Sequence, residues 1–390
     1  TYSALAMKND QDRRLYDFLK AGAARVPVEV EWHRRLQSVM QKLNRFDELM
    51  SHYDKLVEQF PNDSTALYLR GRIEPDLEAA ADYFGRAAVQ DPTDPWPFYS
   101  QAFGMLSLGE FAKAREFCQQ AIDLDPTNDD FKQTMFYLRV VLGELDELER
   151  EMREEIKKGP IVSTFNWRLF RVLAAKGELE ELQTAQNVYA LLRKTQLPSD
   201  PFEELLYSER FVRYCQGDFE KVLQLSQQVQ NGRVRGNLIF QSLLDLDRLE
   251  ELDTASLPDR VTERGYLELF LHLAWLRRGD ATRAEDWFEK AMADFKAGDP
   301  ETKLIASAFA DSRKTQTDGQ ELATRLNRVS LQSEERMLVS LTAAARSTGE
   351  ARRELIDLAE KVNTDPGFPN HFMKRTIEWL RTGEAASTPP

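Results

Sequence analysis

Residues 96–126 read WPFYSQAFGMLSLGEFAKAREFCQQAIDLDP, and this stretch contains every feature of the unit that the chain repeats. An apolar segment comes first and stops at Gly109. A second segment with Ala114 and Ala121 follows and stops at Asp125-Pro126. Apolar residues recur at helical spacing in both segments, and a glycine between two such segments is typical of a tight turn. The stretch therefore predicts two helices joined by a turn and closed by a proline-bearing loop.

The same features return at a fixed spacing. Two series of residues each lie 34 positions apart: Pro92, Pro126 and Pro160 in the loops, and Gly109, Gly143 and Gly177 in the turns. Pro61 precedes the first series by 31 residues. A period of this length is typical of stacked helical units, each of which contacts its neighbours, and not of one closed core. We therefore predict an all-α fold, an α-solenoid of stacked antiparallel helix pairs.

The spacing loosens after residue 197. Later turns are marked by Gly217, Gly279 and Gly349, and a turn near Asp247 has no glycine. We count about ten helix pairs in all. We expect four parts: an N-terminal capping helix and linker at 1–29, regular repeats at 30–197, degenerate repeats at 198–369, and a C-terminal capping helix with a frayed tail at 370–390.

Both ends of the chain have the pattern of a capping helix. Residues 10–22 form an amphipathic segment with Leu15, Phe18 and Leu19 on one side, and Asn370 is placed to cap a final helix. Terminal units of a helical array must cover an otherwise open apolar end, so we expect both helices to act as covers.

Composition narrows the class of partner. The chain carries a net charge of −13 at pH 7, which opposes binding to nucleic-acid phosphates and to anionic membrane surfaces. No stretch approaches the ~18 consecutive apolar residues that cross a bilayer. We therefore expect no nucleic-acid partner and no direct membrane binding. The first segment is locally basic, which we interpret as a solvated helix face, with an acidic partner or an adjoining acidic domain as the alternative. Its basic residues are Arg13, Arg14, Lys20, Arg25, Arg34, Arg35, Lys42 and Arg45.

The two cysteines, Cys118 and Cys215, lie in helical apolar patterns of different repeats. A disulfide needs Cα atoms within ~7 Å, which distant repeats rarely provide. We expect buried thiols in a reducing compartment, and hence a cytoplasmic protein. The chain begins at Thr1 rather than Met, so a mature product with a removed leader or anchor, or a trimmed chain, is the alternative.

The unit at 96–126 resembles the tetratricopeptide repeat. Trp96 or Phe98 stands where that family has an aromatic residue at the start of the first helix, and Ala102 stands at its small position. The rest of the unit matches the family pattern with Gly109-Glu110-Phe111, Ala114, Ala121 and Asp125-Pro126. The second unit matches it with Ala80, Phe84, Ala87 and Asp91-Pro92. The eighth unit matches it with Gly279, Ala284, Phe288 and Ala291. Arg210 and His272 fall near positions where the family has small residues, so the chain departs from the pattern there.

The resemblance is closest over 30–197 and weaker over 200–370. It implies a right-handed superhelix of helical hairpins whose first helices line a concave groove, and it implies that a protein or peptide binds in that groove. Some members of the family grip the terminal carboxylate of chaperones with lysine, asparagine and arginine. This chain has Tyr99, Phe103 and Gln133 at the matching places, so we do not expect a chaperone-tail clamp, although Arg168 and Arg171 could meet an acidic group.

Aromatic and arginine side chains on the first helices are the candidate partner-binding residues, because such side chains bury much area with few torsions. The candidates are Trp96, Tyr99, Phe103, Tyr137, Trp167, Arg171, Tyr207 and Phe211. The alternative for each is packing between neighbouring helices. Trp96, which is followed by Pro97 at a loop-to-helix junction, fits that alternative best.

No pattern of catalytic or metal-binding residues emerges. The four histidines, His33, His52, His272 and His371, form no His-Glu-x-x-His motif, and His33 and His52 on adjacent helices are too few for a metal site. The sequence has no glycine-rich phosphate loop and no Gly-x-Ser-x-Gly elbow. We expect no enzyme activity, no cofactor and no metal.

The resulting prediction is a non-catalytic scaffold that binds a protein or peptide. Three alternatives stay open. The chain could be the regulatory or substrate-recruiting repeat array of a larger multidomain enzyme, such as a kinase or glycosyltransferase. It could be a self-assembling protein that forms a homodimer through its C-terminal repeats, or a helical enzyme without a recognisable motif.

Overall fold

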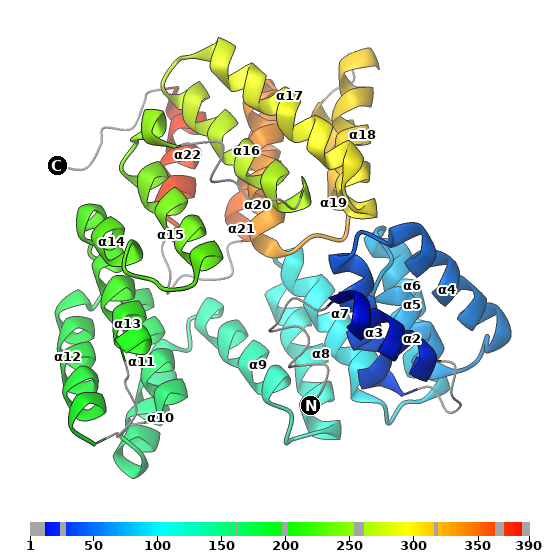
Figure 1. Ribbon diagram of the computed structural model, residues 1–390, viewed down its shortest axis with the longest axis horizontal. Coiled ribbons are helices and arrows are strands. Elements are labelled where there is room, and N and C mark those ends of the chain that lie inside the picture. Colours follow the sequence, from blue (N-terminus) through cyan, green and yellow to red (C-terminus); the bar gives the residue numbers. More distant parts are fainter. Residues whose placement is uncertain are drawn as a thin grey trace. The chain divides into compact units, whose positions relative to one another are not determined.

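The computed structural model describes residues 12–23, 29–160, 162–196, 202–252, 261–315, 319–362 and 370–383. In these residues the fold is all-α, as predicted, and the helices follow one another as antiparallel pairs (Figure 1). Helix α2 (Asp12–Ala23) comes first. The regular part then consists of α3 (Val30–Lys42) with α4 (Phe46–Gln59), α5 (Ser64–Gly71) with α6 (Leu77–Gln90), α7 (Pro95–Ser107) with α8 (Phe111–Leu124), α9 (Asp129–Val141) with α10 (Leu145–Lys158), and α11 (Ser163–Lys176) with α12 (Leu179–Gln196).

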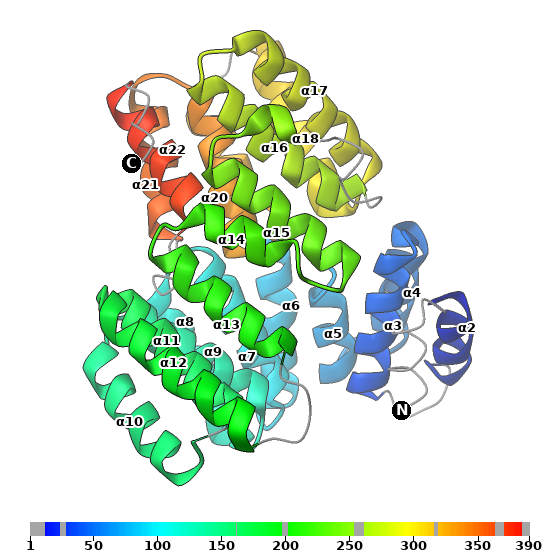
Figure 2. The ribbon, with the colours of Figure 1, turned by 60° about the vertical axis from the view of Figure 1, so that its left-hand side comes forward.

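The later part continues the pairing with less regular lengths (Figure 2). Its pairs are α13 (Phe202–Cys215) with α14 (Phe219–Ser226), α15 (Gly232–Asp245) with the short 3₁₀ turn η1 (Leu249–Glu251), α16 (Val261–Arg277) with α17 (Ala281–Ala297), α18 (Pro300–Thr315) with α19 (Gly319–Asn327), and α20 (Ser333–Ala345) with α21 (Gly349–Lys361). Helix α22 (His371–Thr382) is the last described element. We call the leading member of each pair its first helix and the other its second helix.

Glycines end first helices at the predicted turns. Gly109, Gly143 and Gly177 have φ angles of 71°, 83° and 74°, so all three occupy the left-handed region that glycine adopts at low cost. Asn44 and Asp247 take the same backbone region, with φ of 55° and 57°, in turns that lack a glycine. Asparagine and aspartate tolerate this region better than other residues with a side chain. The period read from the sequence is therefore confirmed at the level of the backbone.

Side-chain caps fix where several helices begin. The Asp94 carboxylate accepts a hydrogen bond from Trp96 N at 3.0 Å, so α7 begins at Pro95. The Asp63 carboxylate accepts from Ala66 N at 2.7 Å, and Asn370 Oδ1 accepts from Met373 N at 3.0 Å. Such caps satisfy backbone N–H groups that have no partner inside the helix. The cap predicted at Asn370 is confirmed.

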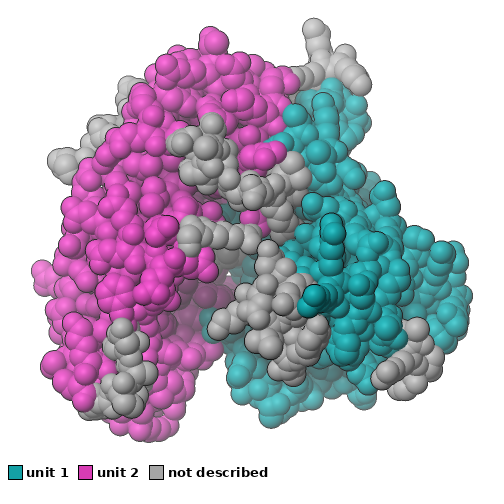
Figure 3. Space-filling view, viewed as in Figure 1, with its two compact units in different colours: residues 1–135, 292–336 teal, residues 136–291, 337–390 magenta. Residues whose placement is uncertain are grey.

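The chain divides into two compact units. Unit 1 comprises residues 1–135 and 292–336, and unit 2 comprises residues 136–291 and 337–390 (Figure 3). The predicted division at 29, 197 and 369 rests instead on how regular the repeats are. It stays a prediction, because its borders fall beside residues 24–28, 197–201 and 363–369, which lie outside the described residues.

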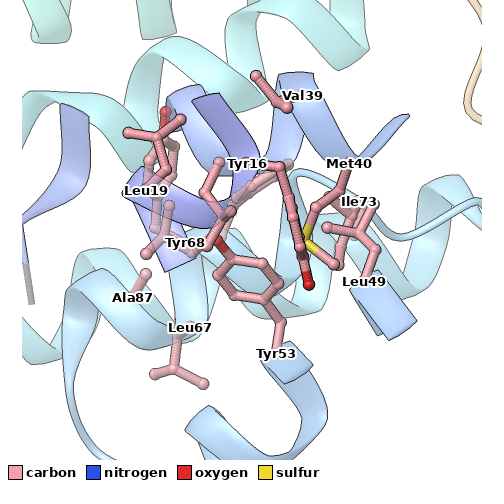
Figure 4. Packing of buried hydrophobic residues seen from close by; sticks show 14 of the residues in the cluster. Tyr16, Leu19, Val39, Met40, Leu49, Tyr53, Leu67, Tyr68, Ile73 and Ala87 are labelled. Atoms are coloured by element: carbon pink, nitrogen blue, oxygen red, sulfur yellow. The ribbon is translucent and has the colours of Figure 1, made fainter. Parts of the chain in front are cut away.

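The core of unit 1 begins with α2 and continues through the first two helix pairs. Leu19, Val39, Leu49, Tyr53 and Leu67 are buried there in one cluster (Figure 4). Small residues make the close helix crossings, since Ala80, Ala87, Ala102, Ala114 and Ala121 are all buried. The array is thus held together by interlocking faces of neighbouring helices.

One residue of α2 differs from its predicted place. Leu15 and Leu19 are buried as expected, but Phe18 lies 47% exposed, with its ring centroid 5.2 Å from that of Trp32. Tyr16 is buried in its stead, because the helix turns its Leu15–Leu19 stripe towards α3. Phe18 therefore lies at the edge of the buried face and not within it.

A short backbone contact joins the two sequence segments of unit 1. Leu77 N donates to Arg328 O at 2.7 Å and Ser330 N donates to Pro75 O at 2.8 Å, which makes an isolated antiparallel bridge. The Arg328 guanidinium also lies 3.0 Å from the Asp76 carboxylate. The α5–α6 turn is thereby tied to the loop that follows α19, although 252 residues separate the ion pair in sequence.

Unit 2 accommodates large residues where the repeat pattern has small ones. Arg210 is buried, and its Nε donates to Ser226 Oγ on the second helix of the same pair at 3.2 Å. His272 is buried as well, and its Nδ1 donates to Ala284 O on α17 at 2.8 Å. A polar bond across the pair thus replaces close approach, which explains why the pattern weakens here without loss of the pairing.

Several expectations fall on residues that the structure does not describe. They are the Val26-Pro27-Val28 linker, the break at Leu197-Pro198-Ser199-Asp200-Pro201, the Asp365-Pro366 loop and the tail after Gly383.

Candidate protein-binding surface

The candidate residues of unit 1 lie on α7. Phe103 is the most open of them: its side chain is 44% exposed, whereas the neighbouring Ala102 is fully buried against the helix pair. Because consecutive residues of a helix point about 100° apart, one can pack inside the pair while the next faces away from it. Phe103 therefore presents an aromatic ring that no described neighbour covers completely.

Trp96 and Tyr99 are held more firmly. The Arg34 guanidinium lies over the Trp96 ring, 4.0 Å from its centroid. The centroids of the Tyr68 and Phe131 rings lie 6.2 and 5.1 Å from that of Trp96. Tyr99 Oη lies 3.0 Å from Thr134 Oγ1, and burial raises the pKa of the Tyr99 phenol. Trp96, on α7, thus contacts residues of the three first helices α3, α5 and α9, which agrees with the packing alternative stated for it above.

In unit 2, Tyr137 on α9 and Arg171 on α11 lie together. The Arg171 guanidinium is 5.2 Å from the centroid of the Tyr137 ring, and the Arg168 guanidinium is 5.1 Å from that of Phe136. A cation over an aromatic face is attracted by the negative charge of that face. Both rings come from α9 and both arginines from α11, so the two contacts join neighbouring first helices.

Trp167, Tyr207 and Phe211 differ in how deeply they are buried. Trp167 is half-buried and meets the edges of Phe170 and Phe211, each with ring centroids 5.8 Å apart. Phe211 is only 4% exposed and belongs to the core. Tyr207 is half-buried against Leu206, Leu225 and Val229. Phe211 thus supports Trp167 from below and offers little surface of its own.

Among the candidate residues, the arrangement leaves one exposed ring in unit 1, that of Phe103, and a half-buried group in unit 2. The group in unit 2 consists of Tyr137, Trp167 and Arg171, and we call it the α9–α11 cluster. Sequence reasoning did not find the Arg34 contact with Trp96. Residues 62 positions apart carry no shared spacing signal, so only the packed structure reveals such a pair.

The reactive side chains of the described region are mostly buried. Cys118 donates to Phe131 O at 3.4 Å, and burial raises the pKa of its thiol to about 11, so it stays protonated near neutral pH. His33 and His52 do meet, with ring centroids 6.1 Å apart, and burial lowers the pKa of His33 to about 4. Among the residues that the structure describes, no group of three or more His, Cys, Asp and Glu is placed to hold a metal ion.

The basic first segment is largely engaged within unit 1. Lys20 and Arg45 both pair with Glu48, at 2.6 and 2.9 Å, and Lys42 pairs with Asp12 at 2.6 Å. The pairs of Lys20 and Arg45 with Glu48 are partly exposed, and such pairs contribute little to stability, about 0–1 kcal/mol each. They nevertheless neutralise part of the local positive charge.

These observations define an all-α helical-repeat protein with aromatic residues on its first helices. Residues 42–95, from the end of α3 to the start of α7, match the family model described as "Tetratricopeptide repeat". This stretch of the chain is therefore similar to the tetratricopeptide repeat. No curated protein matches the chain.

Two solved structures resemble the chain at low identity. One is a tetratricopeptide repeat protein from Parabacteroides merdae ATCC 43184, with 13% identity and a TM-score of 0.43; the match covers 62% of this chain and 96% of that one. The other is the structure titled "Structure of Naa15/Naa10 bound to HypK-THB", with 13% identity and a TM-score of 0.30; it covers 90% of this chain and 51% of that one. The chain thus spans about half the length of the second neighbour, and neither likeness carries an argument about function.

None of the described helices combines the length and the apolar character that crossing a bilayer requires.

Proposed function

We propose that this chain is a non-catalytic scaffold that binds a protein or peptide through aromatic and arginine side chains of its first helices. Phe103 carries the proposal, because its large ring is 44% exposed on the first helix of a repeat. Covering apolar surface is favourable by roughly 25 cal/mol per Å², so a partner that covers this ring gains binding free energy.

The α9–α11 cluster supports the same proposal in unit 2. Tyr137, Trp167 and Arg171 are each half-buried, so they are positioned by neighbours and still present part of their surface. Residues of these types supply a large share of binding energy at protein interfaces when a partner removes them from water. A preorganised ring also loses little conformational entropy on binding.

The chemistry of the buried groups favours binding over catalysis. A general base or nucleophile needs a pKa suited to its task and access to a substrate. The Cys118 thiol is buried with a pKa of about 11, and His33 is buried with a pKa of about 4. Neither group has both properties.

The test is affinity capture with the full chain and two double variants. Phe103→Ala/Trp167→Ala removes one first-helix ring from each unit. Two hot-spot losses of ~1 kcal/mol or more each would weaken a partner at least about 30-fold. We expect proteins retained by the wild-type chain to be lost from this variant, as measured by quantitative mass spectrometry of the captured fraction.

The matched control is Val89→Ala/Leu191→Ala. These side chains are 78% and 63% exposed and lie on second helices, α6 in unit 1 and α12 in unit 2. Retention should be unchanged. Equal retention by all three proteins, or loss only with the control, would contradict the proposal. Because Trp167 also packs on the core, Phe103→Ala and Arg171→Ala are measured singly, with thermal melts to show that each variant is folded.

A further inference from the structure

Helix α22 packs against first helices that precede it by far in the sequence of unit 2. It contacts α21, the neighbour that a terminal cap would cover, and also α15 and α16 (Figure 1). His371, at its start, reaches α13. The face that α22 buries carries Phe372, Met373, Thr376 and Leu380, while Lys374, Glu378 and Arg381 remain exposed. An amphipathic helix therefore lies on a surface built by three first helices.

The aromatic start of α22 contacts rings from three helices, α13, α14 and α16. His371 lies 5.1 Å from the Tyr214 ring and 5.0 Å from the Phe219 ring, measured between centroids. Its Nε2 donates to Tyr214 O at 3.1 Å. The Phe372 ring packs edge-on against the Phe270 ring, with centroids 5.5 Å apart. The Arg277 guanidinium lies over the Phe372 ring, 5.0 Å from its centroid. The first two residues of α22, His371 and Phe372, thus both pack against aromatic rings of other helices.

Arg375 meets a buried carboxylate one turn further along. Its Nη2 lies 3.5 Å from Asp245 Oδ1 and donates to Leu244 O at 3.3 Å. The Asp245 side chain is 0% exposed. Burial raises the pKa of Asp245 to about 6, while Arg375, the Tyr214 phenol, Arg277 and the Phe372 backbone N–H all act to lower it. The charge of Asp245 is therefore stabilised in large part by groups that α22 brings.

The ends of two first helices make this spot negative. Tyr214 and Leu244, whose carbonyls accept from α22, lie in the last turns of α13 and α15. Carbonyls in a last turn have few intrahelical partners and carry the negative end of the helix dipole. Together with Asp245 they favour a cation and the positive N-terminus of a helix. An arginine is suited to this place, since its planar donors can reach a carboxylate and a carbonyl at once.

We propose that the surface formed by α13, α15 and α16 is a docking site for an amphipathic helix that begins with a pair of rings and carries an arginine four residues after the first of them, and that α22 fills this site in the unbound chain. A partner helix of the same chemistry binds by displacing α22. In the described residues, the polar contacts of α22 with α13 and α15 come from the side chains of His371 and Arg375, so α22 can leave as an intact helix. The proposal goes beyond the function proposed above, because it involves neither Phe103 nor the α9–α11 cluster.

The probe is a fluorescein-labelled peptide with the sequence of residues 370–383, NHFMKRTIEWLRTG. It is titrated with the full wild-type chain and with the full chain carrying Arg375→Glu, which sets a second carboxylate against Asp245 and undocks the chain's own helix. We expect the peptide to bind the variant at least about 10-fold more tightly than the wild-type chain, by fluorescence anisotropy, because the vacated site no longer has an internal competitor.

Arg381→Glu is the matched control. Arg381 also lies on α22, but it pairs with Asp357 and Glu360 of α21 and touches none of the three first helices in the described contacts. This variant should bind the peptide like the wild-type chain. A peptide with glutamate in place of its Arg375 equivalent should not bind the Arg375→Glu chain. Equal binding of the peptide to all three chains, or no binding to any of them, would overturn the proposal.

A second measurement keeps the test decisive if the Arg375→Glu chain does not fold. Amide hydrogen exchange of the wild-type chain is followed with and without excess peptide. Displacement predicts faster exchange within residues 372–382 and unchanged exchange in α13, α15 and α16. Exchange in α22 that does not respond to saturating peptide would contradict displacement.

Discussion

At the turn that ends a first helix, one residue must take a positive φ angle so that the second helix can run back along the first. Glycine fills this position at Gly109, Gly143 and Gly177, and Asn44 and Asp247 fill it in two other pairs. Asn and Asp are the residues with a side chain that enter this region most readily. The turn near Asp247 thus keeps its geometry without glycine for a local chemical reason.

Gly143→Ala isolates the cost of this angle. Nothing lies within 4 Å of the Cβ that alanine would add, so the substitution causes no steric clash. Its φ of 83° is nevertheless unfavourable for a residue with a side chain. We expect the free energy of unfolding to fall by about 1–2 kcal/mol in urea titrations.

The control for this change is Gly85→Ala. Gly85 lies inside α6, also with nothing within 4 Å of an added Cβ, and has no positive φ. Alanine is the better helix former there, so we expect stability to rise by about 0.5–1 kcal/mol. Gly143→Asn should cost less than Gly143→Ala. A neutral or stabilising Gly143→Ala would contradict the strained-turn account.

His33 makes the stability of unit 1 depend on pH. His33 is buried between α3 and α4, and its Nδ1 lies 3.1 Å from Tyr53 Oη. Burial is the main cause that lowers the pKa of His33 to about 4, and the neighbouring His52 lowers it further in the same direction. The unfolded chain, with a histidine pKa near 6.5, therefore binds more protons than the folded chain between pH 4 and 6.5. Stability is fully present above this window and is lost as the pH falls through it.

We expect His33→Gln to remove about 2 kcal/mol of the stability difference between pH 7 and pH 4.5. The free energy of unfolding of both proteins is measured in urea at several pH values. Parallel pH profiles for the variant and the wild-type chain would show that His33 is not the titrating group.

At the scale of the element, helix positions followed from the sequence more closely than contacts between distant elements. The turn glycines predicted the helix pairs, and Asn370 predicted the start of α22. The sequence did not predict the bridge between Asp76 and Val329 or the packing of α22 on α15 and α16. Both depend on segments that are far apart in sequence, where no period or motif links the partners.

Arg328→Glu tests whether the bridge of unit 1 depends on its ion pair. The substitution sets a carboxylate against Asp76 and Glu78, which now lie 3.0 and 3.5 Å from the arginine. The pair is partly exposed, so its loss should cost only about 1 kcal/mol. We expect amide exchange at Leu77 and Ser330 to become about 5-fold faster.

Arg325→Glu is the matched control for this experiment. Arg325 pairs with Asp311 and Glu321 within the α18–α19 hairpin. Its reversal should leave exchange at Leu77 and Ser330 unchanged. If both variants speed exchange equally, the effect belongs to the hairpin and not to the bridge.

At the scale of the whole chain, the sequence established the repeat architecture but could not sort the candidate rings. Trp96, Phe103 and Phe211 all stand on first helices, yet Trp96 connects repeats, Phe211 lies in a core and Phe103 faces outwards. Spacing places a residue on a helix face, whereas burial depends on how neighbouring helices pack over that face. No sequence pattern predicted the Asp245 site in unit 2, because the arginine and the helix ends that surround this aspartate are brought to it only by the fold.

The most direct test of the scaffold account is site-specific photo-crosslinking at position 103. A photoreactive phenylalanine analogue replaces Phe103 in one protein and Val89, on a second helix of the same unit, in another. After irradiation in cell extract, the account predicts a defined protein or peptide adduct at position 103 that excess unlabelled wild-type chain suppresses, and no such adduct at position 89. No specific adduct at position 103, or the same adducts at both positions, would contradict it.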